Sequence, residues 1–174
     1  MKRFITLFLF TFIANWAAAQ QKIDYDKKLK ELGIALITPA KPVANYVKMV
    51  RTGNLLYLAG DGPWRADGSY VTGKVGVDLS VEQGYEAAKQ TGISIISTLK
   101  AELGDLNKVK RIVKVLGIVN CASSFTDQPK VINGFSDLIV AVFGDKGKHA
   151  RSAVGMSSLP MNTSVEIEVI VEVE

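Results

Sequence analysis

The C-terminal stretch Val165–Val173, whose sequence is VEIEVIVEV, decides the fold class. Valine or isoleucine occupies every second position of this stretch, and glutamate occupies three of the four positions between them. Because successive side chains of a β-strand point to opposite faces of a sheet, the alternation predicts a strand with one face against a core. The other face must therefore meet water or another subunit.

Further strands and helices are predicted upstream from periodicity and from the residues that start and end elements. Ser80–Gln83 has the spacing of a helix capping box, and Gly104 ends the apolar stripe that follows it. Gly53 and Asn54 form a hairpin-type turn between two apolar runs. The predicted strands span 45–51, 55–59, 109–119 and 151–156, the two long helices follow Ser80 and Asp127, and a short helix lies within 20–32.

The order of these elements predicts an α+β fold. Two strands are followed by a helix, a strand, a second helix and two strands, which favours a mixed β-sheet with both long helices on one face. The chain offers nothing to cover the other face of that sheet. We therefore expect an oligomer in which sheets of several copies meet.

The N-terminus has the three parts of a secretory signal peptide. Lys2 and Arg3 precede the apolar run 4–13, and Ala17–Ala19 supply the small residues of a cleavage site. The run is shorter than the roughly 20 apolar residues that a membrane-spanning helix needs. We predict a signal peptide at 1–19, a lead-in segment at 20–38 and one domain at 39–174. The mature protein would be periplasmic or secreted, without a membrane attachment.

Charge and composition argue against several classes of function. The signal peptide holds two of the 21 basic residues and none of the 17 acidic ones, so the mature chain would carry a net charge of only +2. The basic residues are scattered, which does not favour a nucleic-acid partner. Cys121 and His149 are the only residues of their types, so neither an internal disulfide nor a cysteine zinc site can form. No dinucleotide or phosphate-binding loop motif occurs, and we expect neither a metal nor a cofactor.

Arg151 is the first candidate for a functional residue. It opens a predicted strand just after the glycine-containing turn 144–148, so it is expected at a sheet edge. A guanidinium group matches a carboxylate through two parallel hydrogen bonds. We expect the following hairpin to bring Glu166 and Glu168 back near Arg151. An edge ion pair between Arg151 and Glu166, without a functional role, is the alternative that the residues alone favour.

The segment His149–Val154, with sequence HARSAV, closely resembles the closing signature of the Rid/YjgF family when it is taken together with Leu159–Pro160 and Val165–Glu168. These proteins are the reactive-intermediate deaminases, also labelled endoribonuclease L-PSP. Weaker matches at 45–47, 58–60 and 131–133 follow in the family's order. The resemblance covers residues 39–174.

This resemblance implies a chorismate-mutase-like trimeric barrel with three clefts between subunits. It implies that Arg151 binds the substrate carboxylate and that Glu166 positions or activates water, as the catalytic residues. Tyr46, Gly60 and Asn133 would line the cleft and contact substrate. The implied reaction is the hydrolysis of 2-aminoacrylate-type enamines and imines to 2-keto acids and ammonia, so the expected partners are small 2-imino or 2-keto carboxylates and two further copies of the chain.

Two features separate this chain from the family pattern. Ala59 stands where the family usually has serine, and enzymes that release enamines are mainly intracellular, whereas this chain is predicted to be exported. Both features favour a second hypothesis, a non-catalytic trimer that captures small carboxylates in the cell envelope. Structural roles are the alternatives for two other residues: a packing role for Tyr46, and a solvated turn position for His149. Trp64 lies in the Gly/Pro-containing loop 61–76 and could be either a cleft lid or an interface anchor.

The processing of the N-terminus gives the first testable prediction. Because Ala17–Ala19 end an apolar run with a basic start, cleavage should leave Gln20 as the first residue of the mature chain. Intact-mass analysis of the protein from the envelope fraction measures this directly. Recovery of the uncleaved 174-residue chain from that fraction would contradict the prediction.

Overall fold

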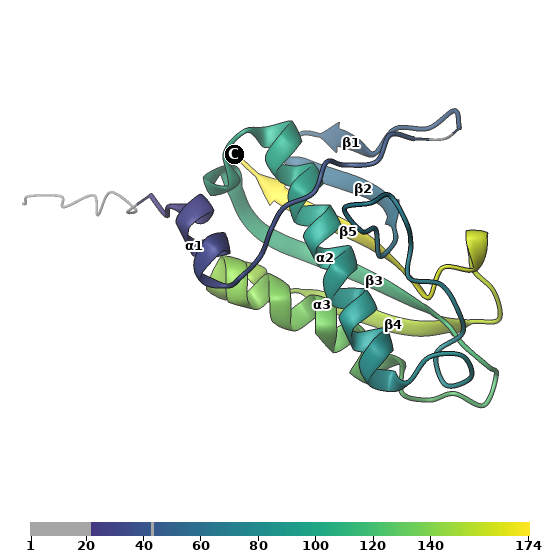
Figure 1. Ribbon diagram of the computed structural model, residues 1–174. Coiled ribbons are helices and arrows are strands. Elements are labelled where there is room, and N and C mark those ends of the chain that lie inside the picture. The colour runs from purple at the N-terminus through teal and green to yellow at the C-terminus, as the bar shows by residue number, and fades with distance from the viewer. Residues whose placement is uncertain (1–21, 43) are drawn as a thin grey trace, which may run out of the picture.

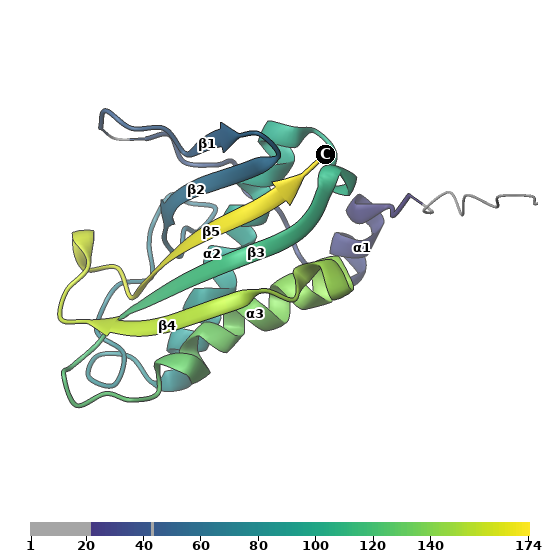
Figure 2. The same ribbon diagram turned by 180° about the vertical axis from the view of Figure 1, so that it is seen from behind.

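A five-stranded mixed β-sheet, covered on one face by two long helices, forms the body of the molecule (Figure 1). The structure is a computed structural model, and it describes residues 22–42 and 44–174. Seen from behind, the sheet lies in front of the helices, and its second face carries no helix of the described chain (Figure 2). The predicted α+β class, with both long helices on one face, is confirmed.

The strands are ordered β1-β2-β5-β3-β4 across the sheet. Their bounds are β1 Met49–Thr52, β2 Leu55–Asp61, β3 Val109–Asn120, β4 Ala150–Met156 and β5 Val165–Val173. All neighbouring strands are antiparallel except β3 and β4, which are parallel. Strand β5 therefore lies at the centre, and β1 and β4 are the two edges.

The first strand is shorter than the sequence predicts. It begins at Met49 rather than Asn45, and Tyr46 and Val47 lie exposed before it. On its other side, β2 changes register against β5 between Leu58 and Asp61. This irregularity ends regular pairing where the candidate site begins.

The expected hairpin between β4 and β5 is wrong. Strand β4 pairs with β3, with Arg151 opposite Val115, whereas β5 pairs with β2 and with the other side of β3. The helix between β3 and β4 returns the chain to the starting end of β3, so β4 runs parallel to β3 at the free edge. Glu166 is opposite Ile118 of β3 instead of a residue of β4.

The helices begin and end largely as their sequences predict. They are α1 Tyr25–Glu31, α2 Val81–Leu103 and α3 Gln128–Phe143, with short 3-10 turns η1 Leu106–Lys108, η2 Gly144–Gly147 and η3 Pro160–Asn162. The Ser80 side chain accepts a hydrogen bond from the Gln83 amide at 3.2 Å, and the Gln83 side chain accepts one from the Ser80 amide at 2.8 Å. Asp127 occupies the N-cap of α3, but its side chain makes no cap hydrogen bond and instead contacts Lys130 at 3.1 Å.

The core lies between the sheet and helices α2 and α3. Inward residues of β5 meet fully buried side chains such as Ile95 of α2 and Phe135 of α3. Helix α1 joins the same core, because Tyr25 is buried with its ring centroid 5.4 Å from that of Phe143. The alternation predicted for Val165–Val173 is confirmed, since all five of its odd-numbered residues are buried.

The second face of the sheet carries exposed apolar side chains near both edges, with glutamates of β5 between them. Val50, Tyr57, Val154 and Met156 are 54%, 45%, 41% and 48% exposed. Strand register puts these side chains on the face opposite the helices, because Tyr57 pairs with Val50 and with Ile170 of β5. Exposed apolar side chains that gather on one face of a sheet are typical of a surface that another protein chain covers.

The predicted signal peptide lies outside the described residues and stays a prediction. Within residues 22–42 and 44–174, no helix combines the length and the apolar character needed to cross a membrane.

The contact between α2 and α3 depends on the absence of a side chain at Gly134. A Cβ atom there would collide with the backbone carbonyl oxygen of Tyr85, and it would lie 3.2 Å from the Lys89 amide nitrogen. We expect Gly134→Ala to lower the free energy of unfolding by about 2 kcal/mol, because backbone atoms in a packed core cannot move aside freely.

Urea denaturation measures this change. Ala141→Leu is the matched control, since it adds atoms at an exposed position of the same helix, and its effect should stay within about 0.5 kcal/mol. Equal stabilities of the two variants would show that α2 and α3 can separate without cost.

Candidate functional site

The candidate residues fall into two groups at different places on one protomer. Tyr46, Gly60 and Glu166 line a pocket of about 320 Å³ at the end of β2. Arg151 and Asn133 lie together on β4 and α3, outside that pocket.

Glu166 lies over the backbone of Gly60. A Cβ atom at residue 60 would collide with the Glu166 carboxylate, so the glycine makes room for it. Glu166 is half-buried, and burial raises its pKa, with further contributions from the carboxylates of Glu168 and Asp61. A carboxyl group whose pKa is moved toward neutral pH is better suited to accept and return a proton.

Asp61 is a buried carboxylate beside Glu166 that the sequence analysis missed. It is only 5% exposed. Its Oδ1 atom accepts hydrogen bonds from Lys48 Nζ at 3.3 Å and from the Gly62 amide at 3.0 Å, and Oδ2 accepts one from Ser94 Oγ at 2.8 Å. Three donors satisfy a buried charge that would otherwise be costly. Asp61 therefore fixes the end of β2 and supplies negative charge near Glu166.

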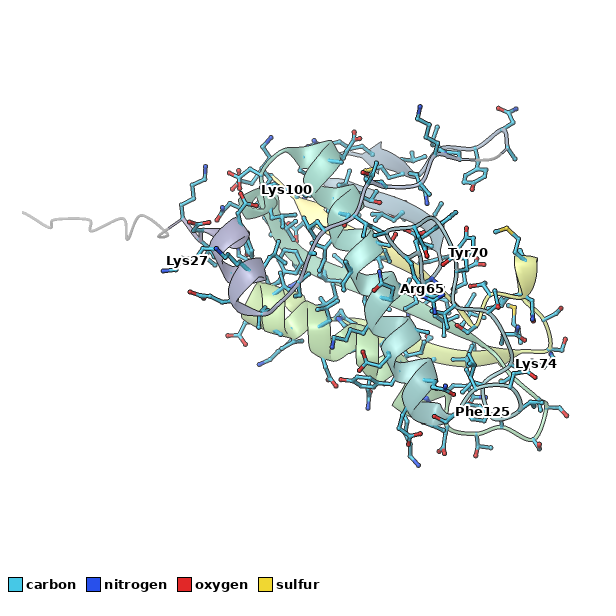
Figure 3. All side chains as sticks on the ribbon, viewed as in Figure 1. Lys27, Arg65, Tyr70, Lys74, Lys100 and Phe125 are labelled. Carbon is cyan, nitrogen blue, oxygen red and sulfur yellow. The ribbon has the colours of Figure 1, made fainter. Side chains whose placement is uncertain are left out.

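Two aromatic side chains form one wall of the pocket. Trp64 and Tyr70 have ring centroids 3.8 Å apart, and the two residues form an isolated β-bridge. Burial, with the nearby Asp61 carboxylate, raises the pKa of Tyr70 to about 12. Tyr70 is labelled in Figure 3 at the end of the molecule away from α1, near the yellow turn η3, whose Met161 also lines the pocket.

Arg151 is held in place by helix α3. Its Nη1 atom donates to Asn133 Oδ1 at 2.9 Å and to Ser136 Oγ at 3.0 Å. Ser136 Oγ lies 3.1 Å from His149 Nε2, and His149 Nδ1 lies 2.6 Å from the carbonyl oxygen of Gly147. A carbonyl oxygen only accepts, so Nδ1 carries the proton and Nε2 accepts from the Ser136 hydroxyl.

This arrangement keeps His149 neutral and leaves part of the guanidinium available. Burial lowers the pKa of His149, and the charge of Arg151 lowers it further. Within residues 22–42 and 44–174, no protein acceptor contacts Nε or Nη2 of Arg151, and no carboxylate forms an ion pair with it. The prediction of a solvated turn position for His149 is wrong, because the ring is half-buried and bonded at both nitrogens.

Arg151 and Glu166 lie on opposite faces of the sheet. Arg151 pairs with Val115, which faces the helices, whereas Glu166 pairs with Ile118 three residues farther along β3. Two strand spacings, about 10 Å, also separate β4 from β5. The edge ion pair considered from the sequence does not form in the protomer. We call the two groups the Glu166 half-site (Tyr46, Gly60, Asp61, Glu166) and the Arg151 half-site (Asn133, Ser136, His149, Arg151).

Other candidates for site chemistry are less well placed. Cys121 is buried, with its Sγ atom 3.8 Å from Gln128 Nε2. Among the described residues, no three His, Cys, Asp or Glu side chains converge in a way that could hold a metal ion. Ser136 was missed as a site residue although one signal was available: it follows Asn133 by three positions, so both lie on the same helix face.

Comparison with known proteins gives a family match over nearly the whole described chain. Residues 26–173 match the model of a family described as "YjgF/chorismate mutase-like, putative endoribonuclease". The matched range includes both half-sites and all five strands.

Individual relatives match over similar lengths. Protein TCP17 of Trypanosoma cruzi is 44% identical over 145 residues, which cover 83% of this chain and 91% of that protein. A 2-iminobutanoate/2-iminopropanoate deaminase of Dermatophagoides farinae is 27% identical over 135 residues, covering 77% and 90% of the two chains. The crystal structure of a protein of unknown function from Agrobacterium tumefaciens is 45% identical, with a TM-score of 0.81 and coverage of 86% and 92%.

The neutral state of His149 predicts a pH dependence of stability. The pKa of His149 in the folded protein lies below the ordinary value of 6.5. As the pH falls through that value, the unfolded chain therefore binds more protons at His149 than the folded chain does. The contribution of neutral His149 is thus complete above about pH 6.5 and is lost progressively at lower pH. Protonation also prevents Nε2 from accepting the Ser136 hydroxyl.

Urea unfolding between pH 5 and 7.5 tests this dependence. The wild-type protein should lose more stability on acidification than His149→Gln, which carries no titrating ring, while all carboxylates remain common to both. Identical pH slopes for the two proteins would show that His149 titrates as it does in the unfolded chain.

Proposed function

Since this chain belongs to the YjgF/chorismate mutase-like family, we propose that it hydrolyses 2-imino acids and their enamine tautomers to 2-keto acids and ammonia. One observation carries the proposal: a guanidinium with two unoccupied donor positions and a half-buried carboxyl with a raised pKa are each held by a dedicated set of neighbours. The deaminase name of the Dermatophagoides relative supports the choice of reaction. We further propose that the protein acts after export, on the basis of its N-terminal sequence.

The proposed reaction needs no covalent enzyme intermediate. An enamine first tautomerises to the imine, in which carbon 2, next to the carboxylate, forms the C=N double bond. Water attacks that carbon and forms the C–O bond as the C=N π bond breaks, while Glu166 accepts one water proton and returns it to the nitrogen, which gives a carbinolamine. Glu166 then takes the hydroxyl proton and passes it to the amine nitrogen, so that the C=O bond forms, the C–N bond breaks, and ammonia departs. Glu166 is suited to this shuttle because its pKa is raised.

Arg151 would hold the substrate carboxylate. Asn133 and Ser136 both bind Nη1, so they orient the guanidinium plane without occupying Nε or Nη2. A carboxylate can take those two donors in a bidentate contact, which fixes both the position and the rotation of the substrate. Such orientation brings the imine carbon to a defined place relative to the attacking water.

We propose that the two half-sites meet between subunits. The Arg151 half-site is at the β4 edge and the Glu166 half-site is near the β1 and β2 edge, so one substrate can reach both only when copies join head to tail. A head-to-tail interface forms a ring if its rotation closes, and three copies give the expected trimer. The sheet face that carries the exposed apolar side chains Val50, Tyr57, Val154 and Met156 would be covered inside this ring.

Mixing two inactive variants tests the reaction and the assembly together. Arg151→Ala should lower kcat/KM by about a hundredfold or more, since loss of one partner of a desolvated charge pair costs roughly 2–5 kcal/mol. Glu166→Gln should lower kcat by about a hundredfold or more, because a general base is lost. Refolded together in equal amounts, they should regain about one quarter of wild-type activity, because one site in four combines an intact Arg151 with an intact Glu166 of the neighbouring copy.

The controls separate assembly from chemistry. Light scattering should give a trimer for the wild type and for both variants, and imines formed in situ by an amino-acid oxidase serve as substrates. Absence of rescue in mixed trimers would contradict a site shared between subunits, and a monomer would contradict the assembly. If a trimer binds 2-ketobutyrate but hydrolyses no imine, the non-catalytic carboxylate-binding hypothesis replaces the deaminase.

A further inference from the structure

We infer that the pocket beside Glu166 contains a side-chain subsite for aromatic 2-imino acids, formed by the adjoining, mutually tilted rings of Trp64 and Tyr70. The inference rests on the proposed deaminase function and names its preferred substrate class. It concerns the loop 62–70, to which the proposed chemistry assigns no role.

The aromatic wall is preorganised. The Trp64 and Tyr70 rings lie against each other with centroids 3.8 Å apart and an interplanar angle of 39°. The Trp64 carbonyl accepts a hydrogen bond from Gln90 Nε2 of α2 at 2.5 Å, and the Arg65 amide donates to the Ser69 carbonyl at 2.8 Å. The loop is therefore tied both to a helix and across its own ends. Ligand contacts made by such a wall do not need a loop to become ordered on binding.

The wall lies beside the proposed reacting centre. The Glu166 carboxylate lies over Gly60, and the Tyr70 ring lies over Gly62, where its Cε1 atom would be 3.0 Å from an added Cβ atom. Gly60 and Gly62 are two residues apart, and two residues of extended backbone span about 6.5 Å. A methyl group on an imine carbon next to Glu166 is too short to cross that distance. A benzyl or indolyl group is long enough, and its ring would meet Tyr70.

The size and charge of the pocket favour the same class of substrate. A volume of about 320 Å³ is much larger than a methyl or ethyl group fills, and unfilled space in a binding site forfeits dispersion contacts. The Asp61 carboxylate and the Lys48 ammonium are paired with each other at 3.3 Å, and Lys41, the other lysine that lines the pocket, is exposed to solvent. Aromatic rings of a ligand can stack on Trp64 and Tyr70 in offset or edge-to-face geometry.

Competition between the enzyme and a chemical trap measures the preference. An L-amino-acid oxidase generates imines from phenylalanine, leucine, alanine and arginine, and semicarbazide traps the imine that escapes hydrolysis. We expect kcat/KM for the phenylalanine-derived imine to exceed that for the alanine-derived imine by about tenfold or more. Trp64→Ala and Tyr70→Leu should remove most of this preference, because they lower kcat/KM for the phenylalanine-derived imine much more than for the alanine-derived imine.

Two further variants make the result specific. Tyr70→Phe keeps the ring and should keep the preference. Tyr85→Leu removes an aromatic ring from α2 outside the pocket, where its hydroxyl bonds Asp137 at 3.0 Å, and should also keep it. Circular dichroism and light scattering verify folding and assembly, and titration of phenylpyruvate against pyruvate gives a readout that does not depend on turnover.

The outcomes distinguish this inference from the proposed function. Three outcomes would overturn the aromatic subsite alone. They are hydrolysis of all imines at similar kcat/KM, a preference for the arginine-derived imine, and an unchanged preference in Trp64→Ala and Tyr70→Leu. Failure to hydrolyse any imine would overturn the deaminase proposal. In that case, tighter binding of phenylpyruvate than of pyruvate, lost in Tyr70→Leu, would still support the subsite, and equal binding would overturn it.

Discussion

Strand β5 is hydrogen-bonded to β2 on one side and to β3 on the other. Its side chains point alternately into the core under the helices and onto the face that no helix of the described chain covers. The valines and isoleucine at its odd-numbered positions are buried under α2 and α3, which leaves its even-numbered positions on the face without helices. Glu166 is one of these, and it is held half-buried only because Gly60 on the neighbouring strand has no side chain. The hydrophobic packing of one face thus determines where the acidic group of the other face lies.

Much of this fold could be predicted because local signals agree with the tertiary structure. The alternation in Val165–Val173 and the capping box at Ser80 depend only on neighbouring residues, and both were found as predicted. Strand pairing is different, since no local pattern states that β4 lies beside β3. The turn before β5 includes Met161 and Asn162 with φ values of 55°, a conformation that few residues other than glycine adopt. The redirection that this turn produces could not be expected from its sequence.

The candidate site shows the same contrast between features that the sequence predicts and features that depend on tertiary contacts. Arg151, Glu166, Tyr46, Gly60 and Asn133 were identified by resemblance to a family, but their separation into two half-sites requires knowledge of the sheet order. The supporting residues were missed because each acts through a partner distant in sequence: Asp61 with Ser94, and Ser136 with both His149 and Arg151. Single residues of these types are common on protein surfaces. Only their contacts distinguish them.

The placement of Arg151 and Glu166 in two separate half-sites, on opposite faces of the sheet, has a consequence for evolution. In a ring whose sites are shared between neighbours, one gene copy could lose Arg151 and another could lose Glu166 after duplication, and the mixed ring would retain working sites. Each copy would then be free to change the half-site that it no longer uses. Divergence into a heteromeric enzyme requires no new interface under this arrangement, because both edges already exist in the ancestral chain.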